Sequence, residues 1–198
     1  MRPNSASRPE YLAAFTEIVQ RIASPLGVLP KQILPIKMYV AGGAALHLYT
    51  GQRVSNDIDA VFSKHIALPS DLEVSYKDAD GASRLLYFDR QYNDTFALMH
   101  EDAYDDSVRL TLRGIDASVL DVRLLSALDL AVSKISRFSG QDRDDIVTLG
   151  KQGLIRSGAL RRRSEQAMEN YVGNLDTLKG SINIACRILE DAEQRSSR

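Results

Sequence analysis

The chain of 198 residues contains one cysteine, three histidines, no tryptophan and no long apolar run. The single cysteine excludes an internal disulfide, and the apolar-periodic segment around Cys186 predicts a buried thiol. No stretch approaches the ~18 consecutive apolar residues of a membrane span. The first ten residues lack the apolar core of a secretory signal. We therefore expect a cytoplasmic protein without a membrane partner.

The sequence also lacks an excess of charge of either sign. It has 25 lysines and arginines against 26 aspartates and glutamates, which gives a formal net charge of -1. Such a chain has no global field that attracts nucleic acid or an anionic membrane. Any nucleic-acid contact would have to be local, and the basic run "LRRRSEQ" at 160–166 is either such a contact or a solvated helix face.

The pattern of apolar residues changes near residue 125, which predicts two domains, 1–125 and 126–198. The first part mixes strand and helix patterns, and the second is helical throughout. We expect strands at 37–41, 57–62, 72–76, 84–88, 95–100 and 118–124. We expect helices at 9–22 and 44–49, and several more after residue 126. Residues 105–113 could form a helix or a strand, and we favour the helix.

Two aspartates lie one residue apart in "NDIDAVF". Because side chains alternate along a strand, Asp57 and Asp59 would project from one face while Ile58 faces the core. Two unpaired carboxylates side by side repel each other, and a divalent cation removes that conflict. The alternative is that both aspartates are solvated at the end of a strand.

Two glycines, Gly42 and Gly43, stand between an apolar strand and the start of a predicted helix. Glycine allows a phosphate to approach the backbone closely, and a helix N-terminus offers N–H groups and a positive dipole. A tight turn without a ligand is the alternative. A short helix and a loop would connect this phosphate site to the aspartates.

Together, these segments resemble the signature of the DNA polymerase β-like nucleotidyltransferase superfamily. In that signature a Gly-Gly or Gly-Ser turn is followed by D-x-D or D-x-E on the next strand. The form "R-x-S-x-D-I-D", with Arg53 and Ser55 before the aspartates, is most similar to minimal bacterial nucleotidyltransferases, including AbiEii-like toxins. The resemblance implies an α/β (α+β) fold, in which helices flank a mixed twisted sheet and a C-terminal helical bundle follows.

The segment "LSALDLAVSKISRFSGQDRDDIVTL" is similar to a downstream region of the same toxin-like group. Lys134 and Arg137 are three residues apart and would share a helix face. The resemblance implies that these two residues contact the nucleotide phosphates, while Asp142 and Asp145 orient Lys134 or the helix pair. An ion-pair cluster on a helical hairpin is the alternative.

The superfamily also has a third carboxylate, on a later strand, which acts as base on the attacking hydroxyl and helps to hold a second metal ion. Asp94 is nearest to the expected place, so we assign it this role. Asp121 has a suitable apolar neighbourhood but comes late. The remaining candidates are Asp89, Glu101 and Asp102.

By resemblance, the expected activity is transfer of a nucleoside monophosphate from an NTP to an acceptor hydroxyl, dependent on Mg²⁺ or Mn²⁺. The acceptor would be RNA, especially a tRNA 3′ end, or a protein or a small molecule. The chain would be the toxin of a toxin–antitoxin pair, with an antitoxin protein as partner. The alternative is a catalytically degenerate module that binds a nucleotide or a protein for regulation.

Overall fold

The computed structural model describes residues 1–95 and 97–196. The chain divides into two compact units, one formed by residues 1–93 and 107–124 and the other by residues 94–106 and 125–198. Residues 94–106 thus group with the helical unit, although the sequence pattern suggested a single boundary near residue 125. No helix in the described part of the chain is long and apolar enough to span a membrane.

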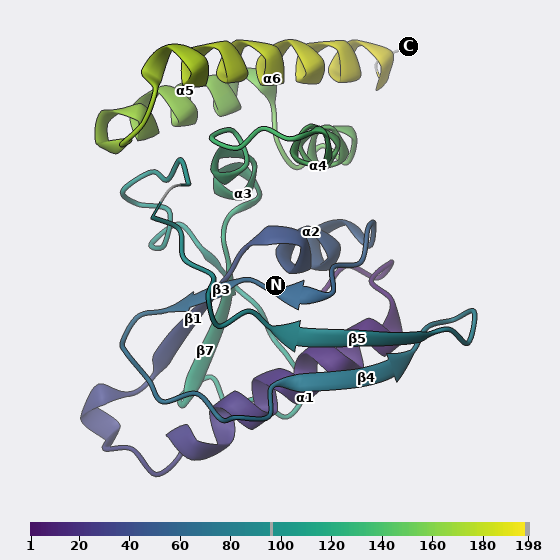
Figure 1. The fold of residues 1–198 in the computed structure, drawn as a ribbon, viewed down its shortest axis with the longest axis vertical. Helices are drawn as coiled ribbons and strands as arrows, with labels where there is room; N and C mark the ends of the chain where they lie inside the picture. The colour runs from purple at the N-terminus through teal and green to yellow at the C-terminus, as the bar shows by residue number, and fades with distance from the viewer. Residues whose placement is uncertain (96, 197–198) are drawn as a thin grey trace. The chain divides into compact units, whose positions relative to one another are not determined.

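The first unit combines helices with two small sheets (Figure 1). Its helical elements are α1 (Pro9–Leu26), η1 (Lys31–Ile33) and α2 (Gly42–Thr50). Its strands are β1 (Ile36–Val40), β2 (Asp57–Ile58), β3 (Ala60–Phe62), β4 (Glu73–Lys77), β5 (Ser83–Phe88), β6 (Val108–Arg109) and β7 (Leu120–Leu124).

Both sheets are mixed. One has the order β3-β1-β7-β6, in which β1 runs parallel to β7 and antiparallel to β3. The other has the order β2-β5-β4, in which β5 runs parallel to β2 and antiparallel to β4. These sheets and the helices around them confirm the predicted α+β class.

The strand predicted at 57–62 is divided at Asp59. Residues before the break pair with β5 in one sheet, and residues after it pair with β1 in the other. The backbone at the break is still held, because the Ala41 amide donates to the Asp59 carbonyl at 2.8 Å. The D-x-D segment therefore passes from one sheet to the other beside the beginning of α2.

The apolar stripe of α1 packs on one face of β4 and β5, behind these strands in Figure 1. Tyr11, Phe15, Ile18 and Ile22 recur at helical spacing and are almost fully buried. Their burial removes apolar surface from water and fixes the hairpin from one side. The opposite face of the hairpin carries mostly exposed residues.

His47 in α2 is buried and has a structural role. The Arg8 backbone amide donates to its Nε2 atom at 3.1 Å, and its Nδ1 atom lies 2.8 Å from the carbonyl oxygen of Gln52. These partners require a neutral ring with its proton on Nδ1. Burial, as the largest cause, lowers the pKa of His47 below its ordinary value.

The second unit is helical. Its elements are α3 (Ala127–Ser133), α4 (Gly140–Lys151), α5 (Ser157–Ala167), η2 (Met168–Asn170) and α6 (Leu175–Ser196). Contacts join α3 to α4 and α5, and join α6 to α4 and α5. Cys186 is fully buried in this unit, as its apolar surroundings predicted.

Two segments differ from the favoured prediction. At 105–113 the chain forms the short strand β6 and loops, which is the alternative to the favoured helix, because Val108 and Arg109 pair with β7 in a sheet that the local pattern does not reveal. The strand expected at 95–100 is not seen in the described residues of that stretch, where the Ala97 amide closes a turn onto Asp94. Phe96 lies outside the described residues.

Candidate nucleotide and metal site

The glycine turn lies directly against the D-x-D segment. Gly42, the first residue of α2, has φ +58°, a backbone conformation that favours glycine. A Cβ atom at this position would collide with the carboxylate of Asp59. The structure therefore brings the beginning of α2 and the second aspartate into direct contact.

The second glycine makes room for Arg53 and Ser55. A Cβ atom on Gly43 would lie 2.7 Å from Ser55 Oγ and 3.0 Å from Arg53 Nη2. Arg53 itself has φ +28°, an uncommon conformation for a residue with a side chain. Such strain is often found at functional sites. A guanidinium beside the first N–H groups of a helix makes this corner suitable for an anion.

Ser55 also connects the glycines to the first aspartate, because its hydroxyl donates a hydrogen bond to Asp57 Oδ1. The hydroxyl is buried and orients the carboxylate, which is itself partly exposed. The four sequence-predicted residues Gly43, Arg53, Ser55 and Asp57 thus form one connected group. The contact of Gly42 with Asp59 adds the remaining two members of the predicted site.

The donor set fits Mg²⁺ or Mn²⁺. Asp57 and Asp59 offer hard carboxylate oxygens beside the glycine turn, where a side chain on Gly42 would collide with Asp59. Within the described residues, no group of three or more His, Cys, Asp or Glu side chains is placed to hold a metal ion. Mg²⁺ commonly binds through one or two carboxylates and completes its shell with substrate phosphates and water. The pair of carboxylates beside the glycine turn is compatible with that kind of site.

A third carboxylate joins this face through the pairing of two strands. β2 and β5 run in parallel, with Asp57 opposite Tyr87 and Ile58 opposite Phe88. The Asp89 amide continues the ladder by donating to the Ile58 carbonyl at 3.1 Å. Continued by one residue, this register places Asp89 opposite Asp59, just beyond the last residues of β5 and β2, and the charges of both carboxylates act on the Tyr87 phenol.

Sequence reasoning named Asp89 only as a secondary candidate. The signal available was its position immediately after an apolar strand, which several other acidic residues share. The pairing of β5 with β2 distinguishes Asp89 from the other acidic candidates. This pairing joins segments that are distant in the sequence. Asp89 Oδ1 also accepts a hydrogen bond from the Gln91 amide at 2.8 Å, which orients the carboxylate.

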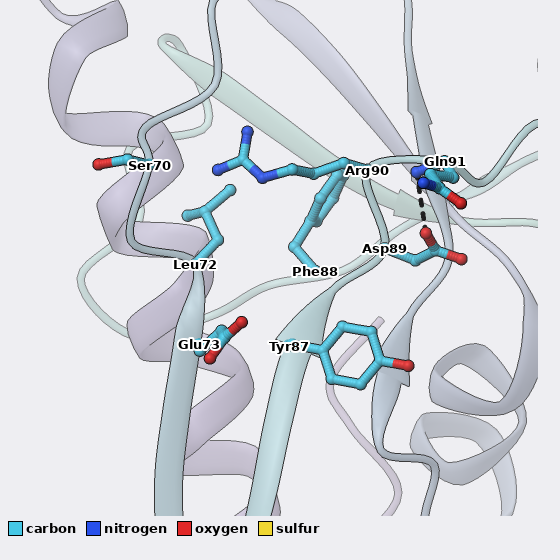
Figure 2. Close-up of a pocket in the computed structure, with 8 residues that line it drawn as sticks. All are labelled: Ser70, Leu72, Glu73, Tyr87, Phe88, Asp89, Arg90 and Gln91. Carbon is cyan, nitrogen blue, oxygen red and sulfur yellow. Dashed lines mark hydrogen bonds between the residues drawn. The ribbon is translucent and has the colours of Figure 1, made fainter.

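Tyr87 lies on β5, opposite Asp57 and two residues before Asp89. Its side chain and that of Asp89 project to the same side in Figure 2. The carboxylate of Asp57, followed by burial and then by Asp89 and Asp59, raises the pKa of the Tyr87 phenol. The phenol is 37% exposed, so an aromatic surface beside the aspartates remains accessible.

A pocket of about 440 Å³ adjoins Tyr87 and Asp89 at the end of the β4–β5 hairpin (Figure 2). Glu73 and Leu72 line it from β4 and the segment before that strand. Arg90 extends toward this segment, and its guanidinium donates to the Pro69 carbonyl. This hydrogen bond joins the two chain segments that border the pocket.

The other carboxylates considered from the sequence have different partners. Asp121 on β7 is buried and accepts hydrogen bonds from Arg109 at 2.7 and 3.1 Å and from Arg123 at 3.2 Å. Asp94 belongs to the second unit, where the hydroxyl of Tyr104 donates to it. Glu101 and Asp102 belong to the second unit as well.

Lys134 and its predicted partners form a compact cluster inside the second unit. Lys134 Nζ lies 2.7 Å from Asp145 Oδ2 and 3.8 Å from Asp142 Oδ1, and all three side chains are buried. Arg137 adds two hydrogen bonds to Asp142, at 2.8 and 2.9 Å. The structure thus brings Asp142 and Asp145 into contact with Lys134.

Asp142 also has a structural role at the beginning of α4. It forms a capping box with Ser139 at the beginning of α4. Burial opposes its ionisation, but the hydrogen bonds from Arg137 and Ser139 outweigh burial and lower the pKa of Asp142 to about 2. The cluster therefore joins α3 and α4 through charges that are balanced within the unit.

Comparison with known proteins identifies the family. No curated protein matches the chain, and no solved structure matches it. A family model described as "Nucleotidyltransferase of unknown function (DUF6036)" matches residues 17–181. This range contains the glycine turn, the D-x-D segment, Asp89 and the Lys134 cluster. The chain belongs to this family of nucleotidyltransferases.

Proposed function

We propose that the protein transfers a nucleoside monophosphate from an NTP to an acceptor hydroxyl and releases pyrophosphate. The observation that carries the proposal is the contact of the glycine turn with the D-x-D segment. Gly42 touches Asp59, and Gly43 touches the Ser55 side chain that is hydrogen-bonded to Asp57. A phosphate cradle and a pair of metal-binding carboxylates thus adjoin each other, as nucleotidyl transfer requires.

In this proposal the phosphates are held by backbone N–H groups of Gly42 and Gly43 and by the guanidinium of Arg53. Ser55 fixes the orientation of the Asp57 carboxylate. A Mg²⁺ or Mn²⁺ ion held by Asp57 and Asp59 would supply neutralisation of the charge on the triphosphate and on the leaving pyrophosphate.

Asp89 acts as the general base in the proposed reaction. The acceptor oxygen attacks the α-phosphorus and its proton passes to the Asp89 carboxylate. The new oxygen–phosphorus bond forms as the bond from the α-phosphorus to the bridging oxygen breaks, and pyrophosphate leaves. The pairing of β5 with β2 supports this role, because it sets Asp89 beside Asp59.

The acceptor belongs to one of the classes implied by the family resemblance. RNA, in particular a tRNA 3′ end, and a protein hydroxyl are the two to test first. Action as the toxin of a toxin–antitoxin pair follows if the acceptor is essential for growth. Growth arrest on expression of the wild-type chain, absent for the Asp57→Ala/Asp59→Ala variant, would support this.

A binding module is the second candidate function. It is favoured by one observation, namely that no group of three or more potential metal ligands is placed together among the described residues. In that case the glycine turn and Arg53 would bind a nucleotide without turnover. Nucleotide binding without pyrophosphate release, in the presence of RNA and protein acceptors, would identify this module.

The decisive experiment uses each α-³²P-labelled NTP with Mg²⁺ or Mn²⁺ and either total RNA or total soluble protein. Label transfer and pyrophosphate release are measured for the wild type and for Asp57→Ala/Asp59→Ala. We expect both signals to disappear in the double variant. Transfer that survives the double substitution would refute the proposed site.

A further inference from the structure

Beside the metal-binding carboxylates, the outer face of β5 carries an exposed aromatic ring and an open pocket. We propose that this surface holds the nucleoside part of the bound NTP, with its base stacked on Tyr87. The inference rests on the proposed function, since it assumes that the phosphates lie at the glycine turn.

The order of elements around β2 gives the direction in which the nucleotide extends. α2, with the glycine turn, contacts β2, while β5 is its hydrogen-bonded neighbour in the sheet. Asp57 is directly opposite Tyr87 across the β2–β5 pair. Neighbouring strands are ≈4.8 Å apart, so the ring lies one strand beyond the carboxylates. A nucleotide anchored by its phosphates at Gly43, with its α-phosphate over Asp57, reaches β5 with its nucleoside.

The charges around the ring favour an uncharged ligand group. Asp57 is directly opposite Tyr87 on β2, and Glu73 is directly opposite it on β4. Asp89 follows two residues after Tyr87 on the same chain segment, and its charge also acts on the phenol. These carboxylates disfavour further phosphates over β5. A base and a ribose are neutral, and a carboxylate such as that of Glu73 accepts hydrogen bonds from amino and hydroxyl groups.

The size of the pocket agrees with this assignment. Its volume of about 440 Å³ lies within the ~300–1,000 Å³ of small-molecule sites. It continues from Tyr87 and Glu73 to Arg90, past the end of both strands. Aromatic stacking accepts any base, because every base has a π-face. Figure 2 shows the Tyr87 ring and the Asp89 carboxylate projecting to the same side among the residues that line the pocket.

Equilibrium binding of non-hydrolysable α,β-methylene analogues of ATP, GTP, CTP and UTP, with Mg²⁺, tests the stacking. We expect Tyr87→Leu to raise the Kd of the preferred analogue about ten-fold, and Tyr87→Phe, which keeps the ring, to change it less than about two-fold. Leu85→Ala is the matched control, because Leu85 is exposed on the same strand, two residues before Tyr87 and further from Asp57. It should leave the Kd unchanged.

Chemical footprinting gives a second readout, which does not depend on turnover. Tetranitromethane should nitrate Tyr87 in the free protein, and the bound analogue should protect it. Tyr76 serves as internal reference, because it is on the same hairpin but contacts Tyr11 of α1 on the inner face. Its nitration should not respond to the analogue.

The outcomes separate this inference from the proposed function. Binding that requires Asp57 and Asp59 but is unaffected by Tyr87→Leu, or that leaves Tyr87 open to nitration, would overturn the nucleoside site alone. A Tyr87→Leu variant in which only the acceptor KM rises would assign the surface to the acceptor and overturn it too. If the wild type binds no analogue, the proposed function fails, and the inference with it.

Discussion

Gly43 shows how a single residue constrains the site. The space that its missing side chain leaves is filled by Ser55 and Arg53, which approach within 2.7 and 3.0 Å of the position of a Cβ atom. The neighbouring Ser55 hydroxyl in turn orients Asp57. A methyl group at residue 43 therefore disturbs Arg53, Ser55 and, through Ser55, the Asp57 carboxylate together.

We predict that Gly43→Ala reduces nucleotidyl transfer at least about 100-fold, because misplacing positioned groups by about 1 Å has effects of that size. Stability should fall by only about 1–3 kcal/mol, the usual cost of overpacking. Transfer assays and urea unfolding would measure both. Gly140→Ala is the matched control for stability, because Gly140 also lies in the first turn of a helix, α4, and has no atom within 4 Å of its Cβ position. Full activity in Gly43→Ala would show that the corner does not hold the phosphates.

The choice of the third carboxylate is also a question at the scale of residues. We predict that Asp89→Asn lowers kcat by about 10²–10⁴-fold, the range for loss of a general base, with little change in NTP affinity. Asp94→Asn should retain activity within a few-fold, since Asp94 is bonded to Tyr104 in the second unit. The reverse result would return the role to Asp94.

At the scale of elements, the Lys134 cluster joins α3 to α4 in the helical unit. Two buried carboxylates surround one buried ammonium, and Arg137 supplies the second positive charge. Removing one partner from such a group leaves an uncompensated buried charge. These contacts give Lys134 a structural role, whether or not it also contacts a nucleotide.

We predict that Lys134→Met destabilises the protein by about 3–5 kcal/mol, as expected when a buried ion pair loses one partner. Urea unfolding followed by circular dichroism would measure the change. Lys151→Met, at the exposed end of α4, should cost less than about 0.5 kcal/mol. A stable Lys134→Met variant with a raised NTP Kd would instead support the nucleotide role inferred from the sequence.

At the scale of the whole molecule, the two units depend on pH through different groups. His47 in the first unit must be neutral, because its Nε2 atom accepts a hydrogen bond from Arg8. Asp142 in the second unit must be ionised, because Arg137 and Ser139 donate to it. The pKa of each group is lower in the folded protein than its ordinary value, so each loses stabilisation as the pH falls.

The pH windows differ. The contribution of His47 should be complete above about pH 6.5, the ordinary pKa of histidine, and should decrease as the pH falls below it. The contribution of Asp142 should be complete above about pH 4 and decrease toward pH 2, the region of its lowered pKa. Urea titrations between pH 8 and 3 would follow both. The loss of stability below about pH 6.5 should be absent in the His47→Gln variant. If the variant still loses stability in this pH range, the assignment to His47 is wrong.

Local chemistry in the sequence was sufficient to determine the central part of the site. The glycine pair, Arg53, Ser55 and the alternating aspartates lie within 18 residues, so a turn, a short helix and a strand bring them together. The N-cap of α3 is local in the same way, because Ser126 accepts a hydrogen bond from the Asp129 amide within one turn. Local geometry of this kind requires no knowledge of distant partners.

Tertiary structure decided the features that depend on pairing between distant segments. Asp89 shares a face with Asp59 only because β5 lies beside β2, and an acidic residue after an apolar strand does not reveal its neighbour. The local pattern around β6 left a helix and a strand open and favoured the helix, and the pairing of two residues with β7 decided for the strand. The break at Asp59 likewise depends on distant strands, because the residues before it pair with β5 and the residues after it pair with β1. The local sequence pattern does not reveal these pairings.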